Sequence, residues 1–209
     1  MLWICTNIGL FLLDPEKGIQ KRFWSGGAGS DFLPCDDIHH LYEDDQGLFW
    51  LATNGCGLVR WEGPNISNST NDKAEKSWRQ FTRLDGLSND VLYAVYEDDN
   101  QNLWMSSDFG IMQFDKKSFQ VNTYLKGDGI THNEFNRIAH FQSKDGTIYF
   151  GSLNGITAFN PKDFYEVKSN IQPELQITAF QQFDGEQNKL INRIGDIHAN
   201  NSIILQPSD

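Results

Sequence analysis

One short pattern occurs four times in this chain, and the repetition limits its fold more than any other feature. In each copy an aromatic residue within an apolar segment is followed six or seven positions later by glycine, and a second apolar segment comes next. The copies recur at intervals of roughly 45–54 residues, which is the spacing of blade-like structural repeats. They read LWICTNIGLFLLD, FWLATNGCGLVRW, LWMSSDFGIMQFD and IYFGSLNGITAFN, and their aromatic residues are Trp3, Trp50, Trp104 and Tyr149.

A second shared piece precedes the last three copies. Each of these pieces joins a short apolar segment to a polar turn that ends at Gly47, Asn102 or Gly146. Such residues tolerate the left-handed backbone of a tight hairpin. One repeat therefore predicts three or four short antiparallel strands, which is one blade of a β-propeller. A sustained helical period is absent from the sequence, which excludes helical solenoids.

These motifs give the chain a family resemblance. An acidic turn, then Leu-Trp with Ser or Thr, then Gly-Ile or Gly-Leu, then Phe-Asp resembles the two-component regulator propeller repeat over about residues 1–164. The last copy, residues 127–164, resembles the closing blade that precedes the Y_Y_Y (triple-tyrosine) domain of that family. The segment after it, IQPELQITAFQQFDGEQ, is similar to the opening of that immunoglobulin-like sandwich.

The predicted fold is all-β: four-stranded antiparallel blades of a partial propeller, followed by the start of an immunoglobulin-like β-sandwich. A propeller closes with four to eight blades, so we expect a fragment that continues at both ends. The predicted boundaries are residues 1–165 for the blades (1–31 partial, then 32–85, 86–128 and 129–165), 166–172 for a linker and 173–209 for a truncated Y_Y_Y domain.

Charge and cysteine content exclude several classes of protein. The net charge is −11 and no Lys/Arg cluster is present, which argues against nucleic acid and against anionic membrane surfaces as partners. We expect a membrane connection only through a segment outside this chain. Cys5, Cys35 and Cys56 have no metal-binding or redox spacing, which favours free thiols. A disulfide between Cys35 and Cys56 is an alternative for which the sequence gives no support.

The repeated carboxylates and aromatic residues are better explained by structure than by chemistry. Glu43-Asp44-Asp45 and Glu97-Asp98-Asp99 occupy the same turn in two repeats, whereas a catalytic pair needs a single location. Asp side chains in such turns bind nearby backbone N–H groups. The four recurring aromatic residues suit a packing layer between blades better than a sugar-stacking platform. We predict no catalytic residue, no metal site and no cofactor.

A ligand is expected at the face of the propeller that carries the loops around its axis. The polar candidates there are drawn from the loops before each inner strand and after each anchored strand, and Arg137 stands out because the equivalent positions of the sister repeats hold no cation. The candidates are Asp37, Asn54, Asn89, Asp108, Asn133 and Arg137.

The resemblance implies a periplasmic, non-catalytic sensor. Proteins of this kind place a propeller and a Y_Y_Y domain outside the membrane and a histidine kinase or diguanylate cyclase inside it. A small-molecule or oligosaccharide ligand and a homodimeric parent are then expected. Two alternatives stay open: a fragment of a propeller carbohydrate-active enzyme (lyase or glycosidase), and a protein-interaction scaffold.

Overall fold

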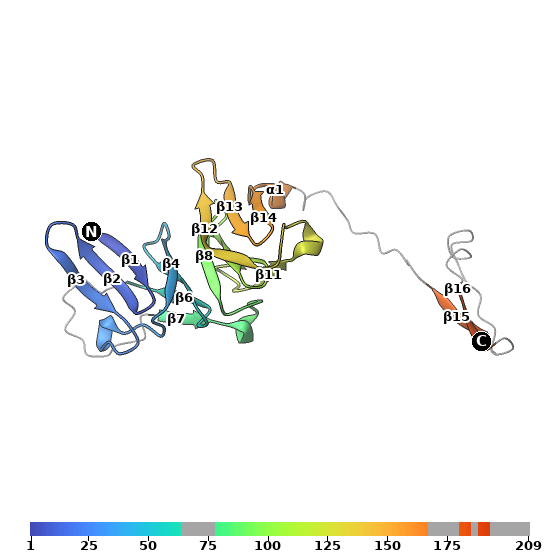
Figure 1. Cartoon of the computed structure of the whole chain (residues 1–209), viewed down its shortest axis with the longest axis horizontal. Helices are drawn as coiled ribbons and strands as arrows, with labels where there is room; N and C mark the ends of the chain where they lie inside the picture. The colour runs from blue at the N-terminus through green and yellow to red at the C-terminus, as the bar shows by residue number, and fades with distance from the viewer. Residues whose placement is uncertain (64–77, 167–179, 185–187, 193–209) are drawn as a thin grey trace. The chain divides into compact units, whose positions relative to one another are not determined.

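A computed structural model describes residues 1–63, 78–166, 180–184 and 188–192 of the chain (Figure 1). The chain separates into two compact units, Met1–Glu166 and Val167–Asp209. In the described parts the structure consists of small antiparallel sheets with a few short helical turns, so the predicted all-β class with four-stranded blades is confirmed.

Four sheets lie in the described residues of the first unit, and we number them as blades 1 to 4. Blade 1 is β1 (Leu2–Thr6), β2 (Gly9–Asp14) and β3 (Gly18–Phe23). Blade 2 is β4 (Ile38–Glu43), β5 (Phe49–Thr53), β6 (Leu58–Trp61) and β7 (Trp78–Phe81). Blade 3 is β8 (Leu92–Glu97), β9 (Asn102–Ser107), β10 (Ile111–Asp115) and β11 (Val121–Tyr124). Blade 4 is β12 (Phe135–Gln142), β13 (Ile148–Ser152) and β14 (Gly155–Phe159), followed by α1 (Asp163–Glu166). Short 3-10 turns follow blades 1 to 3: η1 (Gly29–Asp31), η2 (Arg83–Asp85) and η3 (Lys126–Asp128).

The repeated glycine has a steric cause. Gly57 and Gly110 have φ values of +71° and +89°, a region that side chains rarely adopt. A Cβ at Gly57 would lie 2.0 Å from the carbonyl oxygen of Phe81, and one at Gly110 would lie 2.6 Å from that of Tyr124. In both blades the glycine thus makes room for the end of the fourth strand. Blade 4 has no fourth strand among the described residues, and the space beside Gly155 is almost open.

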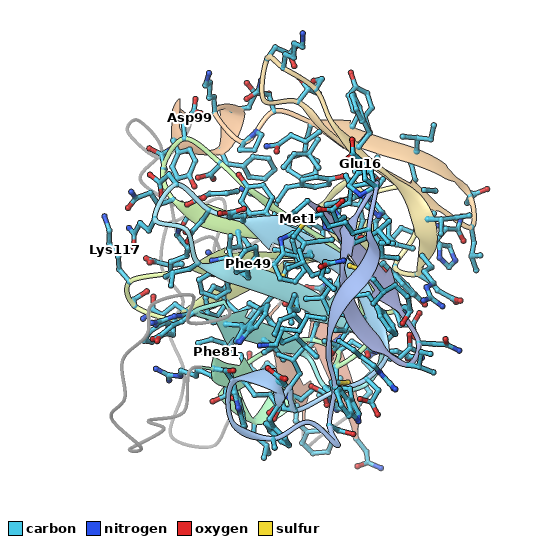
Figure 2. The ribbon with its side chains drawn as sticks, turned by 90° about the vertical axis from the view of Figure 1, so that its left-hand side faces the viewer. Met1, Glu16, Phe49, Phe81, Asp99 and Lys117 are labelled. Atoms are coloured by element: carbon cyan, nitrogen blue, oxygen red, sulfur yellow. A yellow bond between two sulfur atoms is a disulfide. The ribbon has the colours of Figure 1, made fainter. Side chains whose placement is uncertain are left out.

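The apolar core lies between neighbouring blades. One buried cluster joins blades 1 and 2, a second joins blades 2 and 3, and a third joins blades 3 and 4. Phe49 and Phe81 lie among packed side chains, whereas Asp99 and Lys117 project into solvent (Figure 2). Burial of large aromatic side chains between neighbouring blades is the main source of stability for sheets that are too small to be stable alone.

The predicted aromatic packing layer is confirmed in the middle blades and wrong in the last. Trp50 and Trp104 are 1% and 0% exposed, and Trp3 is partly buried against blade 2. Tyr149 is 38% exposed and contacts Phe141 of its own sheet. The reason is that, within the described part of the chain, no further sheet packs over that side of β13.

The second unit is described only at one hairpin, β15 (Gln181–Asp184) and β16 (Lys189–Asn192). Most of the predicted linker, 166–172, and most of the predicted sandwich segment, 173–209, lie outside the described residues. Within the described ranges, none of the helices has the length and apolar character needed to cross a bilayer.

Candidate functional site

Three of the predicted site residues meet at one end of the blades. The Asp37 carboxylate precedes β4 and accepts a hydrogen bond of 2.8 Å from Asn54 Nδ2, in the turn after β5. Its other oxygen lies 3.3 Å from a guanidinium nitrogen of Arg137, on β12 of blade 4. Blade 2 and blade 4 therefore contact each other directly through side chains that are 100 residues apart in sequence.

Two residues that the sequence analysis missed extend this contact to blade 3. The His39 ring lies 5.4 Å from the Tyr93 ring in a stacked arrangement, and its Nε2 lies 3.7 Å from Asp37. The Tyr93 hydroxyl donates a hydrogen bond to Asp108, another predicted site residue. We call these six side chains the mouth cluster: Asp37, His39, Asn54, Tyr93, Asp108 and Arg137.

Asn89 and Asn133 are not part of the mouth cluster. The Asn89 side-chain oxygen accepts a hydrogen bond of 2.8 Å from the backbone N–H of Val91, two residues along. The Asn133 oxygen accepts one of 2.7 Å from the N–H of Lys126. Both amides therefore hold loops in shape, as Asn commonly does in turns.

The environment of the cluster sets the protonation of its members. His39 Nδ1 lies 2.8 Å from the carbonyl oxygen of Leu92, which can only accept, so Nδ1 carries a proton. Burial lowers the pKa of His39, which favours the neutral ring at pH 7. Burial and the hydrogen bond to the Asp108 carboxylate both raise the pKa of Tyr93, so this hydroxyl stays a donor. The cluster thus offers carboxylates, an amide and a guanidinium side by side.

Access to the cluster is through Arg137 and Asn54, which are exposed, and through Asp37, which is partly exposed. The Arg137 side chain is 47% exposed and that of Asp37 is 26% exposed, whereas that of His39 is 3% exposed. A half-exposed ion pair contributes little to stability, roughly 0–1 kcal/mol. A polar ligand can therefore replace either partner of this pair at small cost, and a hydroxyl-rich or amide-bearing molecule matches the donors and acceptors present.

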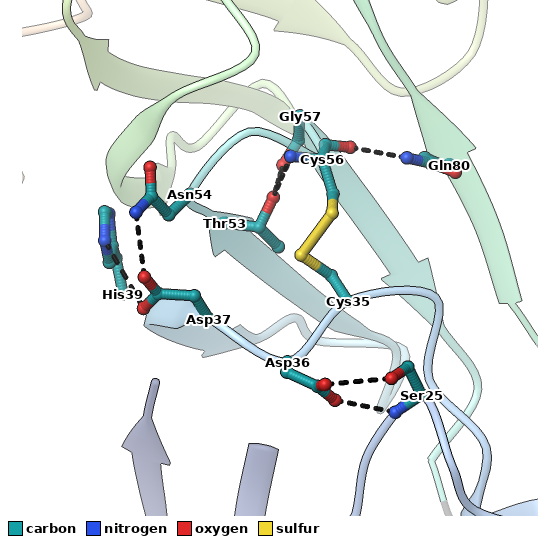
Figure 3. Close-up of a disulfide and its surroundings, with 10 residues drawn as sticks. All are labelled: Ser25, Cys35, Asp36, Asp37, His39, Thr53, Asn54, Cys56, Gly57 and Gln80. Atoms are coloured by element: carbon teal, nitrogen blue, oxygen red, sulfur yellow. Dashed lines mark hydrogen bonds and ion pairs between the residues drawn. A yellow bond between two sulfur atoms is a disulfide. The ribbon is translucent and has the colours of Figure 1, made fainter. Parts of the chain in front are cut away.

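A disulfide holds two of these loops together, and the free-thiol prediction for its cysteines is wrong. Cys35, before β4, is bonded to Cys56, after β5 (Figure 3). Their Cα atoms are 6.2 Å apart, within the usual range for a disulfide. Asp37 lies two positions after one cysteine and Asn54 two positions before the other, so the bond restrains both. Cys5 is free, and burial raises the pKa of its thiol to about 11, which makes it unreactive.

The repeated acidic turns serve structure, as predicted. Asp44 accepts backbone hydrogen bonds from Gln46 and Leu48 with one oxygen, and from Trp50 Nε1 at 2.9 Å with the other. Asp98 does the same in blade 3, with Trp104 Nε1 at 2.8 Å. Each turn is thereby tied to the packing layer of its own blade.

One group of three acidic residues nevertheless has the composition of a metal site. Ligand atoms of Asp44, Asp45 and Glu97 lie within 4.8 Å of one another. The ammonium group of Lys116 lies 2.8 Å from Asp44 and also pairs with Glu97. A side-chain cation therefore already compensates two of the three carboxylates, and this group offers no argument for a metal.

Comparisons with known proteins agree with this architecture. Residues 33–55 and 86–109 match the family model described as two component regulator propeller. A protein called histidine kinase P4, from Formosa agariphila, is 25% identical over 185 residues, which make up 86% of this chain and 12% of that protein. Among solved structures, the extracellular domain of the putative hybrid two-component system BT3049 from B. thetaiotaomicron is 27% identical, with a TM-score of 0.64, over 90% of this chain and 24% of that one.

The chain carries two component regulator propeller repeats. It is homologous to the extracellular domain of a hybrid two-component system, and it spans about a quarter of that solved domain and a much smaller share of the histidine kinase. PorZ of Porphyromonas gingivalis, an essential surface component of the type-IX secretion system, is similar at a TM-score of 0.51 and 15% identity, which indicates a shared fold alone.

Proposed function

We propose that this chain is part of the extracytoplasmic ligand-sensing region of a bacterial transmembrane receptor. The observation that carries the proposal is its 27% identity and TM-score of 0.64 to an extracellular domain of a hybrid two-component system over 90% of the chain. The output domain, a histidine kinase or a diguanylate cyclase, would lie outside this chain, and the region itself would be non-catalytic.

The disulfide supports a periplasmic location. Disulfides persist in oxidising compartments and are rare in the cytosol, where thiols are kept reduced. The Cys35–Cys56 bond closes a loop over a sequence separation of 21 residues and restrains Asp37 and Asn54. A sensor exposed to the periplasm gains a preorganised binding face from such a bond, because fewer loop conformations are lost when the ligand binds.

The mouth cluster is the proposed ligand site. It joins three blades, so a ligand that binds there stabilises one arrangement of blades 2, 3 and 4 over others. A ligand shifts such an equilibrium only by its difference in affinity for the two states. Its mixture of carboxylate, amide and guanidinium groups suits a small polar molecule or an oligosaccharide.

The remaining features of the receptor follow the family resemblance. Residues 173–209 would begin the Y_Y_Y immunoglobulin-like sandwich, and the parent protein would be a homodimer that reaches the membrane through a segment outside this chain. Binding in the propeller would then change the arrangement of the sandwich pair and so the output.

Binding by the full chain tests the proposed site. Calorimetry against a panel of neutral and acidic oligosaccharides and their monosaccharides is expected to find one ligand whose affinity falls at least tenfold in Arg137→Ala and Asp37→Asn. Arg83→Ala removes an exposed arginine of η2 that is not a member of the cluster, and it should leave the affinity unchanged. Equal affinities in all three variants would place the ligand elsewhere.

The sensor class has its own test. The surrounding reading frame is expected to encode further propeller repeats, a membrane-spanning segment and a kinase or cyclase domain. In the intact receptor, the ligand found above should change autophosphorylation or cyclase activity, and Arg137→Ala should weaken that response. A reading frame without a membrane span or an output domain would overturn the sensor proposal, while the binding site could still stand.

A further inference from the structure

A cavity of about 140 Å³ lies between blade 3 and blade 4, and none of the residues around it belongs to the mouth cluster. It opens beside α1 and the η3 turn, and strands β9, β10, β11 and β14 contribute to its walls. The residues around it are Trp104, Ile111, Tyr124, Asp128, Gly129, Ile130, Thr157, Ala158, Phe159 and Phe164.

The equivalent space between blades 2 and 3 is filled. Alignment of the repeats on their glycines places Thr157 at the position of Met112. Met112 is fully buried in the blade 2–blade 3 core, and its sulfur accepts the backbone N–H of Ser88 at 3.2 Å. The Thr157 hydroxyl accepts the N–H of Thr131 at 3.1 Å instead. The equivalent hydrogen bond is therefore present in blade 4, but the side chain that makes it is shorter and fills less space.

The outer edge of the blade 3–blade 4 interface also has fewer packed side chains than the outer edge of the blade 2–blade 3 interface. Between blades 2 and 3, Phe119 and Val121 pack against the core from the turn before β11 and from β11 itself. Between blades 3 and 4, Phe164 of α1 takes the place of Phe119, and among the described residues no strand follows β14 to supply a counterpart of Val121. A shorter side chain inside and a missing strand outside together leave the cavity.

The walls are mainly aromatic, and the Thr157 hydroxyl inside them is hydrogen-bonded, whereas Asp128 is an exposed residue at the edge of the cavity. The Trp104 ring lies 4.8 Å from Phe159 and 4.9 Å from Phe164, and Tyr124 lies 5.2 Å from Phe164. The Thr157 hydroxyl is within 2.9 Å of the Thr131 hydroxyl, and the Asp128 carboxylate accepts the N–H of Leu125 at 2.7 Å. Hydroxyl groups placed against the aromatic rings would therefore lose their bonds to water without finding replacements, at a cost of about 1–3 kcal/mol for each buried group.

We propose that this space is a binding site for a compact, largely apolar ligand of about one six-membered ring. An apolar cavity of about 150 Å³ in another protein admits benzene, so the volume is sufficient. A ring in this position would contact Trp104 and Phe159 from opposite blades and so join blade 3 to blade 4. The proposal is independent of the polar ligand proposed for the mouth cluster.

Calorimetry and melting of the full chain test this site with toluene as the probe and methyl glucopyranoside as the polar ring of similar size. Toluene is expected to bind once per chain and to raise the melting temperature as its concentration increases. The glucoside is expected not to bind in this cavity and therefore not to raise the melting temperature by binding there. In a ¹⁵N spectrum toluene should shift the Trp104 indole signal, identified by its loss in Trp104→Phe, and leave the Trp50 signal in place.

Filling and opening variants locate the probe. Thr157→Met restores the residue of the sister interface and should weaken toluene binding at least tenfold without lowering the melting temperature. Ile130→Phe fills the same space from another element and should do the same if Thr157→Met is poorly folded. The matched control is Ile156→Thr, an exposed neighbour on the same strand, which should leave the affinity within twofold.

Four results would overturn the proposal. The first is a wild-type chain that does not bind toluene. The second is that both filling variants bind toluene as tightly as the wild type, and the third is that the glucoside displaces toluene at equal concentration. A loss of binding in Arg137→Ala would also contradict it, because that residue belongs to the mouth cluster and lines no part of this cavity.

Discussion

The interface between blades 2 and 3 and the interface between blades 3 and 4 are built from the same repeat but balance charge differently. At the first, the Asp44 turn faces Glu97 of the next blade, and Lys116 lies between the two carboxylates. At the second, the Asp98 turn faces Gln142 at the position equivalent to Glu97, and the Tyr165 hydroxyl donates to Asp98 at 2.8 Å.

The difference teaches that the number of buried carboxylates decides which partner the repeat recruits. The side chains of Asp44 and Glu97 are 0% and 8% exposed, so two negative charges need a cation. Burial alone would raise the pKa of Asp44, but hydrogen bonds from Lys116 and Trp50 hold it below its usual value. Burial raises the pKa of Glu97, and Lys116 only partly offsets it. A single carboxylate, Asp98, is satisfied by a neutral hydroxyl.

The largest expected effect comes from removal of the cation. Lys116→Met leaves two buried carboxylates without a positive partner, which should lower the free energy of unfolding by about 3–5 kcal/mol. Urea denaturation of the full chain at pH 7 measures the loss. Without Lys116 the folded chain favours protonated carboxylates, so their folded pKa values rise above the unfolded ones and the deficit should shrink as the pH falls toward 4.

Two variants isolate the charge balance. Lys117→Met removes the exposed neighbouring lysine and should change stability by no more than about 0.5 kcal/mol. Glu97→Gln in the Lys116→Met background reproduces the single-carboxylate pattern of the next interface and should recover much of the loss. Equal stabilities for Lys116→Met and Lys117→Met would contradict the comparison.

The second effect is a pH dependence that both interfaces share, because β8 lies beside β4 and β12. His40 of β4 and His140 of β12 lie 4.6 Å apart between ring centres, and Tyr96 of β8 contacts both. Burial, followed by the neighbouring His140, lowers the pKa of His40 to about 4. The unfolded chain then binds more protons than the folded chain between about pH 6.5 and pH 4.

The free energy of unfolding should therefore keep its full contribution from neutral His40 above about pH 6.5. It should fall by up to about 3 kcal/mol as the pH drops toward 4. Burial lowers the pKa of His140 too, which adds to the same trend. The slope of unfolding free energy against pH measures the effect, and His40→Gln should flatten it whatever its effect at pH 7. An unchanged slope in that variant would show that other groups cause the acid sensitivity.

The third effect comes from giving the filled interface the residue of the open one. Met112→Thr removes a fully buried side chain from the blade 2–blade 3 core, which should cost about 2 kcal/mol. The hydroxyl of the new threonine can accept the backbone N–H of Ser88, as the Thr157 hydroxyl accepts that of Thr131. The variant should therefore still fold. The stoichiometry of toluene binding should rise from one to two per chain, and a stoichiometry that stays at one would show that packing outside this position closes the site.

Local features of this molecule were predictable from sequence, and contacts between distant repeats were not. The turn role of Asp44 and the packing role of Trp104 depend on positions that recur within one blade, so periodicity reveals them. The Arg137–Asp37 pair joins residues 100 positions apart, and the Lys116–Asp44 pair joins residues 72 apart. No spacing rule predicts which side chains meet across neighbouring sheets.

The misjudged residues have the same origin. Cys35 and Cys56 pair only because the turns around β4 and β5 come together in the folded blade. Tyr149 occupies the anchor position of its repeat, but the burial of that position depends on a neighbouring sheet. Among the missed residues, His39 could have been suggested by its place beside Asp37, whereas Tyr93 gave no signal, because Asp108 lies 15 residues away from it.

The smallest predicted effect is at the neutral partner. Tyr165→Phe removes a hydroxyl that donates to Asp98 and accepts from Gln113 Nε2 at 2.9 Å. Asp98 keeps the Trp104 indole and its backbone donors, so the loss should be about 1 kcal/mol in the same urea assay. Burial and the Asp98 hydrogen bond raise the pKa of Tyr165, so the hydroxyl stays protonated and the loss should be constant between pH 6 and pH 9.

A stricter version of this test adds the missing charge. Gln142→Glu places a second carboxylate beside the Asp98 turn, where Tyr165 offers a neutral hydroxyl and the exposed Lys162 is already paired with Asp99 at 3.0 Å, and it should cost more than Tyr165→Phe does. If Gln142→Glu is neutral at pH 7 while Lys116→Met is severely destabilising, the two interfaces differ in solvent access rather than in charge balance. The carboxylate rule would then hold for blades 2 and 3 alone.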